Sequence, residues 1–151
     1  MSVHRARPAR GSPALLLAVF WLGLLAGVSF LATPVKFAAP GLSLPVALEV
    51  GRVTFGLFSK VEWGLAALLC AAVLTGRLGA GATLPALLAA GIVALQALWL
   101  LPVLDARVGE IAAGAAPSAS RHHGIYVALE AAKALLLILA ALAALRPREA
   151  R

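Results

Sequence analysis

SLPVALEVGRVTFGLFSKVEW, residues Ser43–Trp63, is the stretch in which an otherwise apolar chain repeatedly places charged residues beside sequence typical of membrane spans. On a helix that turns about 100° per residue, Lys60 lies about 20° from Glu49, and Arg52 lies about 60° from Glu49 on the other side. The rest of the circumference is apolar, unlike a surface helix of a soluble protein. We therefore expect a helix that contacts lipid on most sides and turns its polar stripe toward other helices.

The overall composition excludes a soluble globular protein. Of 151 residues, 62% are hydrophobic, whereas soluble domains contain about 45–50% apolar residues. The single cysteine, Cys70, rules out an internal disulfide or a multi-cysteine metal site. The formal net charge of +7 reflects arginines near the two chain ends, a pattern of membrane topology rather than of nucleic-acid binding. We expect the lipid bilayer as a partner and no nucleic acid.

The apolar runs predict four transmembrane helices, because crossing a ~30 Å hydrocarbon core takes about 20 residues. The predicted spans are about 13–33, 58–75, 84–104 and 123–145. A helix from Leu44 to Thr75 would be about 48 Å long, so residues 44–57 are expected to form an interfacial amphipathic helix before span two.

The predicted fold is all-α, an integral membrane four-helix antiparallel bundle covering residues 13–145. It is flanked by a basic arm at 1–12 and a basic tail at 146–151.

The distribution of arginine predicts the orientation. Four spans place both termini on one side, where the arm, Arg77 and the tail hold seven arginines and one acid, Glu149. Cytoplasmic flanks carry such an excess of basic residues. We expect a multi-pass protein of the cell membrane, of the bacterial inner-membrane type, with both termini cytoplasmic. The sequence leaves open whether the protein forms a homo-oligomer or binds another membrane protein.

Span four carries a second polar face. Measured from His123 at about 100° per residue, Tyr126, Glu130 and Lys133 lie within about 80° of one another. Glu130 and Lys133 lie about 10 and 15 Å further along the axis, within the hydrocarbon. A charge there costs at least about 2.5–3.5 kcal/mol, so both side chains must face the bundle and find partners.

Several opposite charges are available to these two residues. The candidate partners are Arg52 or Lys60 for Glu130, Glu49 or Glu62 for Lys133, and the two residues for each other. We expect the Gln96 amide of span three to complete the cluster.

These polar side chains form a candidate ligand or ion site, which consists of Glu49, Arg52, Lys60, Gln96, His123, Tyr126, Glu130 and Lys133. One interpretation is a site for a small solute or ion in the extracytoplasmic half of the bundle. Another is a set of structural ion pairs that fixes helix register. A third alternative is a different span boundary that leaves the charges in the interface.

The sequence supplies no clear catalytic or metal-binding motif. His122 and His123 are weak candidates for metal or haem ligands, because adjacent helical residues point about 100° apart. No catalytic triad, phosphate-binding loop or nucleophile elbow is present, so we predict no catalytic residue and no cofactor.

Motifs along the chain carry a resemblance to a known family. They are Phe20, Trp21 and Gly23 in span one, Pro34 to Phe37, the Gly51-Arg52-x-x-Phe55 helix with Phe58 and Trp63, Gln96 and Pro102, and His123-Gly124. With them the chain resembles the small four-span membrane proteins related to eukaryotic transmembrane protein 205. That resemblance covers most of the chain and implies a fold but no reaction, because the family lacks a settled activity.

Three classes of function are compatible with these features. We expect a non-enzymatic binding, transport-associated or accessory protein of the membrane. The alternatives are a purely structural subunit and a cofactor- or metal-using enzyme. The enzyme alternative is suggested by a histidine near the last span, which is similar to that of another four-span group, the fungal anthrone oxygenases.

Overall fold

The computed structural model describes residues 12–116 and 120–145, which are helical throughout except for short turns. The elements are α1 (Pro13–Leu25), η1 (Ala26–Ala32), α2 (Thr33–Lys36), α3 (Leu44–Thr75), α4 (Ala80–Leu95), η2 (Gln96–Leu100), α5 (Leu101–Ala112) and α6 (Arg121–Leu145). The basic arm and tail lie, except for Ser12, outside this part of the chain.

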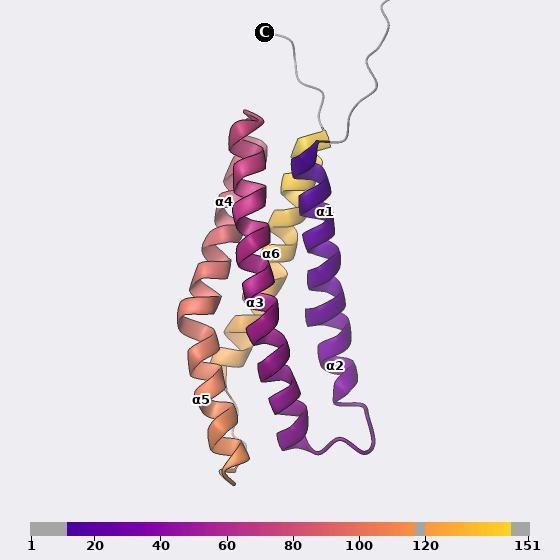
Figure 1. The fold of residues 1–151 in the computed structure, drawn as a ribbon, viewed down its shortest axis with the longest axis vertical. Coiled ribbons are helices and arrows are strands. Elements are labelled where there is room, and N and C mark those ends of the chain that lie inside the picture. Colours follow the sequence, from indigo (N-terminus) through magenta and orange to yellow (C-terminus); the bar gives the residue numbers. More distant parts are fainter. Residues whose placement is uncertain (1–11, 117–119, 146–151) are drawn as a thin grey trace, which may run out of the picture.

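Four continuous helical rods are long and apolar enough to cross a membrane. They are Pro13–Lys36, Leu44–Thr75, Ala80–Ala112 and Arg121–Leu145. The rods run antiparallel, so Pro13 and Leu145 lie at the same end of the bundle (Figure 1). The predicted all-α four-helix bundle is confirmed, and the protein is a multi-pass membrane protein.

Neighbouring rods form a closed ring, in which α1 and α4 each pack against both α3 and α6. We call the end that contains α2, α5 and the first turns of α3 and α6 the distal end, and the end near Pro13 and Leu145 the proximal end. Packing is extensive between α4 and α6 but slight between α5 and α6. The helices therefore separate toward the distal end, as Figure 1 shows.

The α3 helix is one unbroken element of 32 residues. The predicted interfacial segment 44–57 continues without a break into the span at 58–75. Gly51 and Gly56 do not interrupt the helix, because glycine costs about 1 kcal/mol of helix propensity but keeps every backbone hydrogen bond. Whether the first turns lie in the membrane interface stays a prediction.

Two of the other three rods each contain a π-helical segment, which lies just before a proline. Pro34 follows η1 and Pro102 follows η2. Proline lacks an N–H and clashes with the carbonyl four residues earlier, which belongs to Phe30 in one rod and Leu98 in the other. Local π turns accommodate such prolines in membrane helices. In η1 the Thr33 hydroxyl also donates to the Val28 carbonyl at 2.8 Å.

The proximal half of the bundle is closely packed. Its core consists mainly of small residues facing a few larger aliphatic ones: Ala14, Ala18, Ala66, Ala82, Ala86, Ala89, Leu69, Val73, Val93 and Leu137. Small residues allow helix backbones to approach closely, which is how membrane helices gain van der Waals contact.

Candidate functional site

The centre of the bundle holds a buried ammonium group. Lys133 is 0% exposed, and its Nζ lies 2.6 Å from Glu62 Oε1, 2.7 Å from Glu130 Oε1 and 2.8 Å from Gln96 Oε1. These partners come from α3, α6 and η2. An ammonium has three donors, so Lys133 is fully hydrogen-bonded by oxygens from three rods.

The first rod completes this network. Trp21 in α1 donates its indole N–H to Glu62 Oε1 at 3.0 Å, and the Ser29 hydroxyl in η1 donates to Glu130 Oε2 at 2.6 Å. The Gln96 amide also donates to Glu130 Oε1 at 2.9 Å. All four rods therefore meet in what we call the central network: Trp21, Ser29, Glu62, Gln96, Glu130 and Lys133.

The central network contains more acidic than basic groups. Glu62 and Glu130 are each only 2% exposed, and Lys133 is the single cation among them. With both carboxylates ionised the network would hold one excess negative charge, which is costly inside a membrane protein. It is neutral when it holds one additional proton, or when a cationic group joins it.

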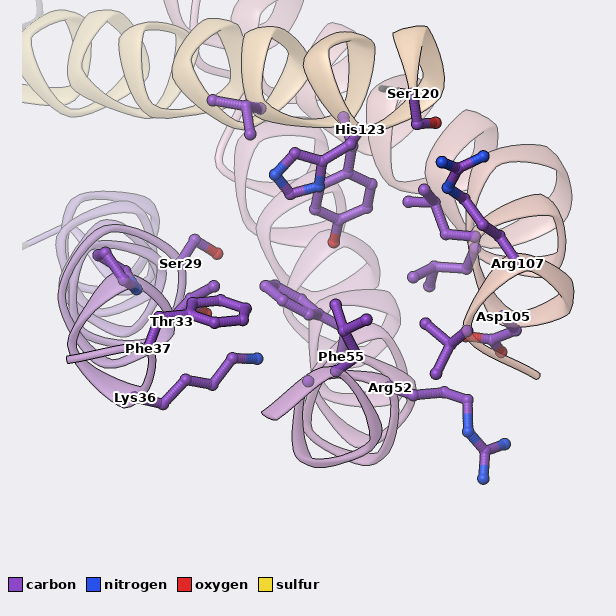
Figure 2. Close-up of a pocket in the computed structure, with 18 of the residues that line it drawn as sticks. Ser29, Thr33, Lys36, Phe37, Arg52, Phe55, Asp105, Arg107, Ser120 and His123 are labelled. Carbon is purple, nitrogen blue, oxygen red and sulfur yellow. The ribbon is translucent and has the colours of Figure 1, made fainter. Parts of the chain in front are cut away.

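A cavity of about 650 Å³ opens between the helices at the distal end and reaches the central network. Ser29 and Glu130 belong both to its lining and to the network, and they form its base. Aromatic and aliphatic side chains such as Phe37 and Phe55 line its walls, and charged side chains lie around them (Figure 2).

Tyr126 brings a phenol hydroxyl to this cavity. Its side chain is 5% exposed and lines the cavity, with its ring edge-to-face against Phe55 at 5.4 Å. Within residues 12–116 and 120–145 its hydroxyl makes no hydrogen bond, and the buried Ser120 Oγ of the same cavity likewise has none. A phenol can donate and accept, so the cavity offers unused hydrogen-bonding capacity beside Glu130.

Four of the predicted site residues come together as expected. Gln96, Glu130 and Lys133 belong to the central network. Tyr126 lies beside the network, because its backbone carbonyl oxygen is 3.5 Å from the Gln96 amide nitrogen. The predicted ion pairs of Lys133 with Glu62 and with Glu130 are confirmed.

The predicted role of the α3 polar stripe is wrong. Glu49 and Arg52 pair with each other along the helix surface, with Arg52 Nε 2.8 Å from Glu49 Oε2, and Lys60 is exposed and outside every ion pair of the described chain. Glu130 therefore does not pair with Arg52 or Lys60, nor Lys133 with Glu49. Glu62 lies about 220° around the helix from Glu49, so Glu49 and Lys60 point away from the centre of the bundle, whereas Arg52 lies at the distal cavity.

The buried face of α3 is the one that looked apolar. It carries Ala47, Gly51, Phe58 and Glu62, which lie about 160–220° around the helix from Glu49. An exposed pair of opposite charges three residues apart needs no partner on another helix. The charges of the stripe therefore do not need to be buried against other helices. Glu62, in contrast, is the single charged residue on the buried face and needs partners inside the bundle.

The two histidines lie in different surroundings. The His122 ring packs edge-on against Trp99 at 6.1 Å, whereas His123 is exposed and lines the cavity. Across the described residues, no three His, Cys, Asp or Glu side chains gather as metal ligands.

Two residues of the central network escaped the sequence analysis, and a third, Glu62, was considered only as one partner of Lys133. Trp21 could have been found, because an indole N–H within an apolar span must reach an acceptor. Ser29 gave no such signal, since a lone serine is common in membrane helices.

Comparison with known proteins gives no match: no protein-family model, no curated protein and no solved structure matches the chain. The resemblance to the four-span family related to transmembrane protein 205 therefore stays a prediction.

Proposed function

We propose that this membrane protein is a non-enzymatic binding or transport-associated protein that holds a small amphipathic solute in the distal cavity. The observation that carries this proposal is the meeting of an apolar cavity with a buried polar network at Glu130. Ligand sites typically combine apolar walls with a few converging polar groups. Here Glu130 and Tyr126 supply those groups at the base.

Charge supports a solute that brings a cationic or hydrogen-donating group to the base. The central network has two carboxyls for one ammonium. A ligand ammonium near Glu130 would balance the excess negative charge, and its N–H groups would also have as an acceptor the hydroxyl of Tyr126, for which the described residues supply no partner. The aromatic faces of Tyr126 and Phe55 would further favour a cation.

The two π-helical segments support function rather than scaffolding alone. Ser29 lies in η1 and Gln96 in η2, so both segments contribute side chains to the central network. Short π segments recur at functional sites in membrane and soluble proteins. The prolines account for the turns themselves, but a network that served only to fix helix register would need no cavity beside it.

The closed proximal half favours a binding pocket over a continuous pore. Small-residue packing fills the bundle between the central network and the proximal end. From the arginine distribution we infer that the distal end is extracytoplasmic, so that solutes enter from outside the cell.

A pair of matched leucine substitutions tests the proposal. Leu104 lines the cavity, whereas Leu98 on the same rod is 75% exposed. We expect native mass spectrometry of wild-type protein in nanodiscs to show a copurified small molecule that Leu104→Trp loses and Leu98→Trp keeps. Equal occupancy in both variants, or an empty wild-type protein that also binds no amine probe, would show that the cavity is not a binding site.

A further inference from the structure

Lys36 is a cation of the distal cavity that pairs with no carboxylate of the described residues. It is the last residue of α2, and Figure 2 shows its side chain extending from that side toward α3. Its Nζ lies 5.0 Å from the centroid of the Phe37 ring, and no carboxylate of the described chain lies within 4.0 Å of it. Its charge is therefore not neutralised by the protein segments that surround it.

The ammonium of Lys36 lies against a glycine of the neighbouring helix. Lys36 Nζ lies so close to Gly51 of α3 that a Cβ at that position would overlap it. Gly51 is buried and also lines the cavity. The absence of a side chain there gives the ammonium its place against the cavity wall.

The other charged side chains that line the cavity either form an ion pair or lie on a different wall. Arg52 is paired with Glu49, and the acid Asp105 lies with Arg107 on the opposite wall formed by α5 (Figure 2). An anion entering the cavity would therefore meet an unpaired ammonium on the α2 side. Charge-assisted hydrogen bonds of this kind are about twice as strong as neutral ones.

The spacing between Lys36 and the base of the cavity restricts the shape of the ligand. Ser29, which contacts Glu130, precedes Lys36 by seven residues on the same rod, a distance of about 10 Å along the axis. His123 and Glu130 on α6 bound the cavity over a similar length. The base of the cavity and the backbone of Lys36 are thus separated by roughly 10 Å along the rod, with apolar walls between them.

We propose that Lys36 recognises an anionic group, so that the ligand is a zwitterionic amphiphile with a cationic end at Glu130 and an anionic end at Lys36, separated by an apolar body. The inference rests on the proposed function of the cavity. It adds the charge and the length of the solute, and it assigns Lys36 and Gly51 to a second recognition site.

Three straight-chain probes separate the two ends of the ligand. 8-Aminooctanoate carries both charges, n-octylamine only the cation, and octanoate only the anion. In calorimetric titrations of the full chain in nanodiscs, we expect 8-aminooctanoate to bind wild-type protein about tenfold more tightly than octylamine. The shorter 4-aminobutanoate cannot reach both ends and should show no such gain.

Variants of the second site give the decisive comparison. Lys36→Gln should abolish the tenfold advantage of 8-aminooctanoate, and Gly51→Ala, which displaces the ammonium, should reduce it; neither variant should weaken octylamine binding. Lys60→Gln, which removes a cation from the outer face of α3, should retain the advantage. Thermal unfolding of each variant checks that the fold is intact.

The outcomes distinguish the two proposals. If octylamine binds but 8-aminooctanoate gains nothing, or if the gain survives Lys36→Gln, the inference about Lys36 is wrong and the cavity remains a binding site. If none of the probes binds and no copurified molecule is found, both proposals fail.

Discussion

Replacing Lys133 by methionine should be far more damaging than replacing Glu130 by glutamine, although both residues are buried in the same network. Lys133→Met removes an ammonium that holds three oxygens at 2.6–2.8 Å and leaves two carboxyls without a counterion. Breaking a buried ion pair in this way costs about 3–5 kcal/mol. For a chain of this size that corresponds to a fall of about 6–20 °C in Tm.

Glu130→Gln, in contrast, removes the excess negative charge and keeps an oxygen acceptor for Lys133. The Ser29 hydroxyl can accept from the new amide instead of donating. We expect a loss of no more than about 1 kcal/mol, the size of one ordinary hydrogen bond.

The assay is thermal unfolding of detergent-solubilised protein, measured for both single variants and for Glu62→Gln/Glu130→Gln/Lys133→Met. The triple variant carries no charge in the network and should recover most of the stability lost in Lys133→Met. Equal losses in the two single variants, or no recovery in the triple variant, would refute the charge balance on which the proposed site depends.

Further predictions concern the edge of the network and the topology. Trp21→Phe keeps an aromatic ring but removes the indole N–H that donates to Glu62, together with part of the buried ring volume, and should cost about 1–3 kcal/mol in denaturant unfolding; a loss below about 0.5 kcal/mol, the usual range for surface changes, would mean that the bond is unimportant. Ser29→Ala should cost about 1–2 kcal/mol, since the hydrogen bond to a charged acceptor is lost, whereas Ser29→Thr should retain most of the stability. A reporter inserted at Gly114 should be extracytoplasmic and one fused after Arg151 cytoplasmic, and the reverse result for both would invert the proposed direction of solute entry.

The sequence predicts the fold and the centre of the site because both follow from the cost of placing charge in hydrocarbon. Four apolar runs long enough to span a bilayer leave little choice of architecture. Glu130 and Lys133, well inside one of those runs, have to face the bundle and find each other or an opposite charge. Their pairing is therefore predictable without coordinates.

The orientation of α3 was not predictable in the same way. Helical periodicity identifies a polar stripe but does not say whether its charges are satisfied on the helix itself, as those of Glu49 and Arg52 are. The buried face carries a single ionisable residue, Glu62, among small and aromatic neighbours. The role of Glu62 depends on partners from other helices, and a local sequence pattern does not show which residues these are.

The π-helical segments explain why Ser29 was missed. At a uniform 100° per residue Ser29 lies about 80° from Trp21, on a different face of the helix. An i→i+5 turn takes a smaller angular step per residue, which brings Ser29 back toward the face occupied by Trp21. Both side chains then reach the central network from one rod.

The separation between a closely packed proximal half and an open distal half also bears on how such a protein can diversify. The buried apolar core lies in α1, α4, the second half of α3 and the end of α6, whereas most of the cavity wall is supplied by the distal segments, namely η1, α2, α5 and the first turns of α3 and α6. We expect random mutagenesis of those wall segments to yield folded variants with altered ligand preference. The same number of changes in the alanine-rich half should instead be eliminated by misfolding. The architecture thus allows new specificities to be selected on a scaffold whose folding is left untouched.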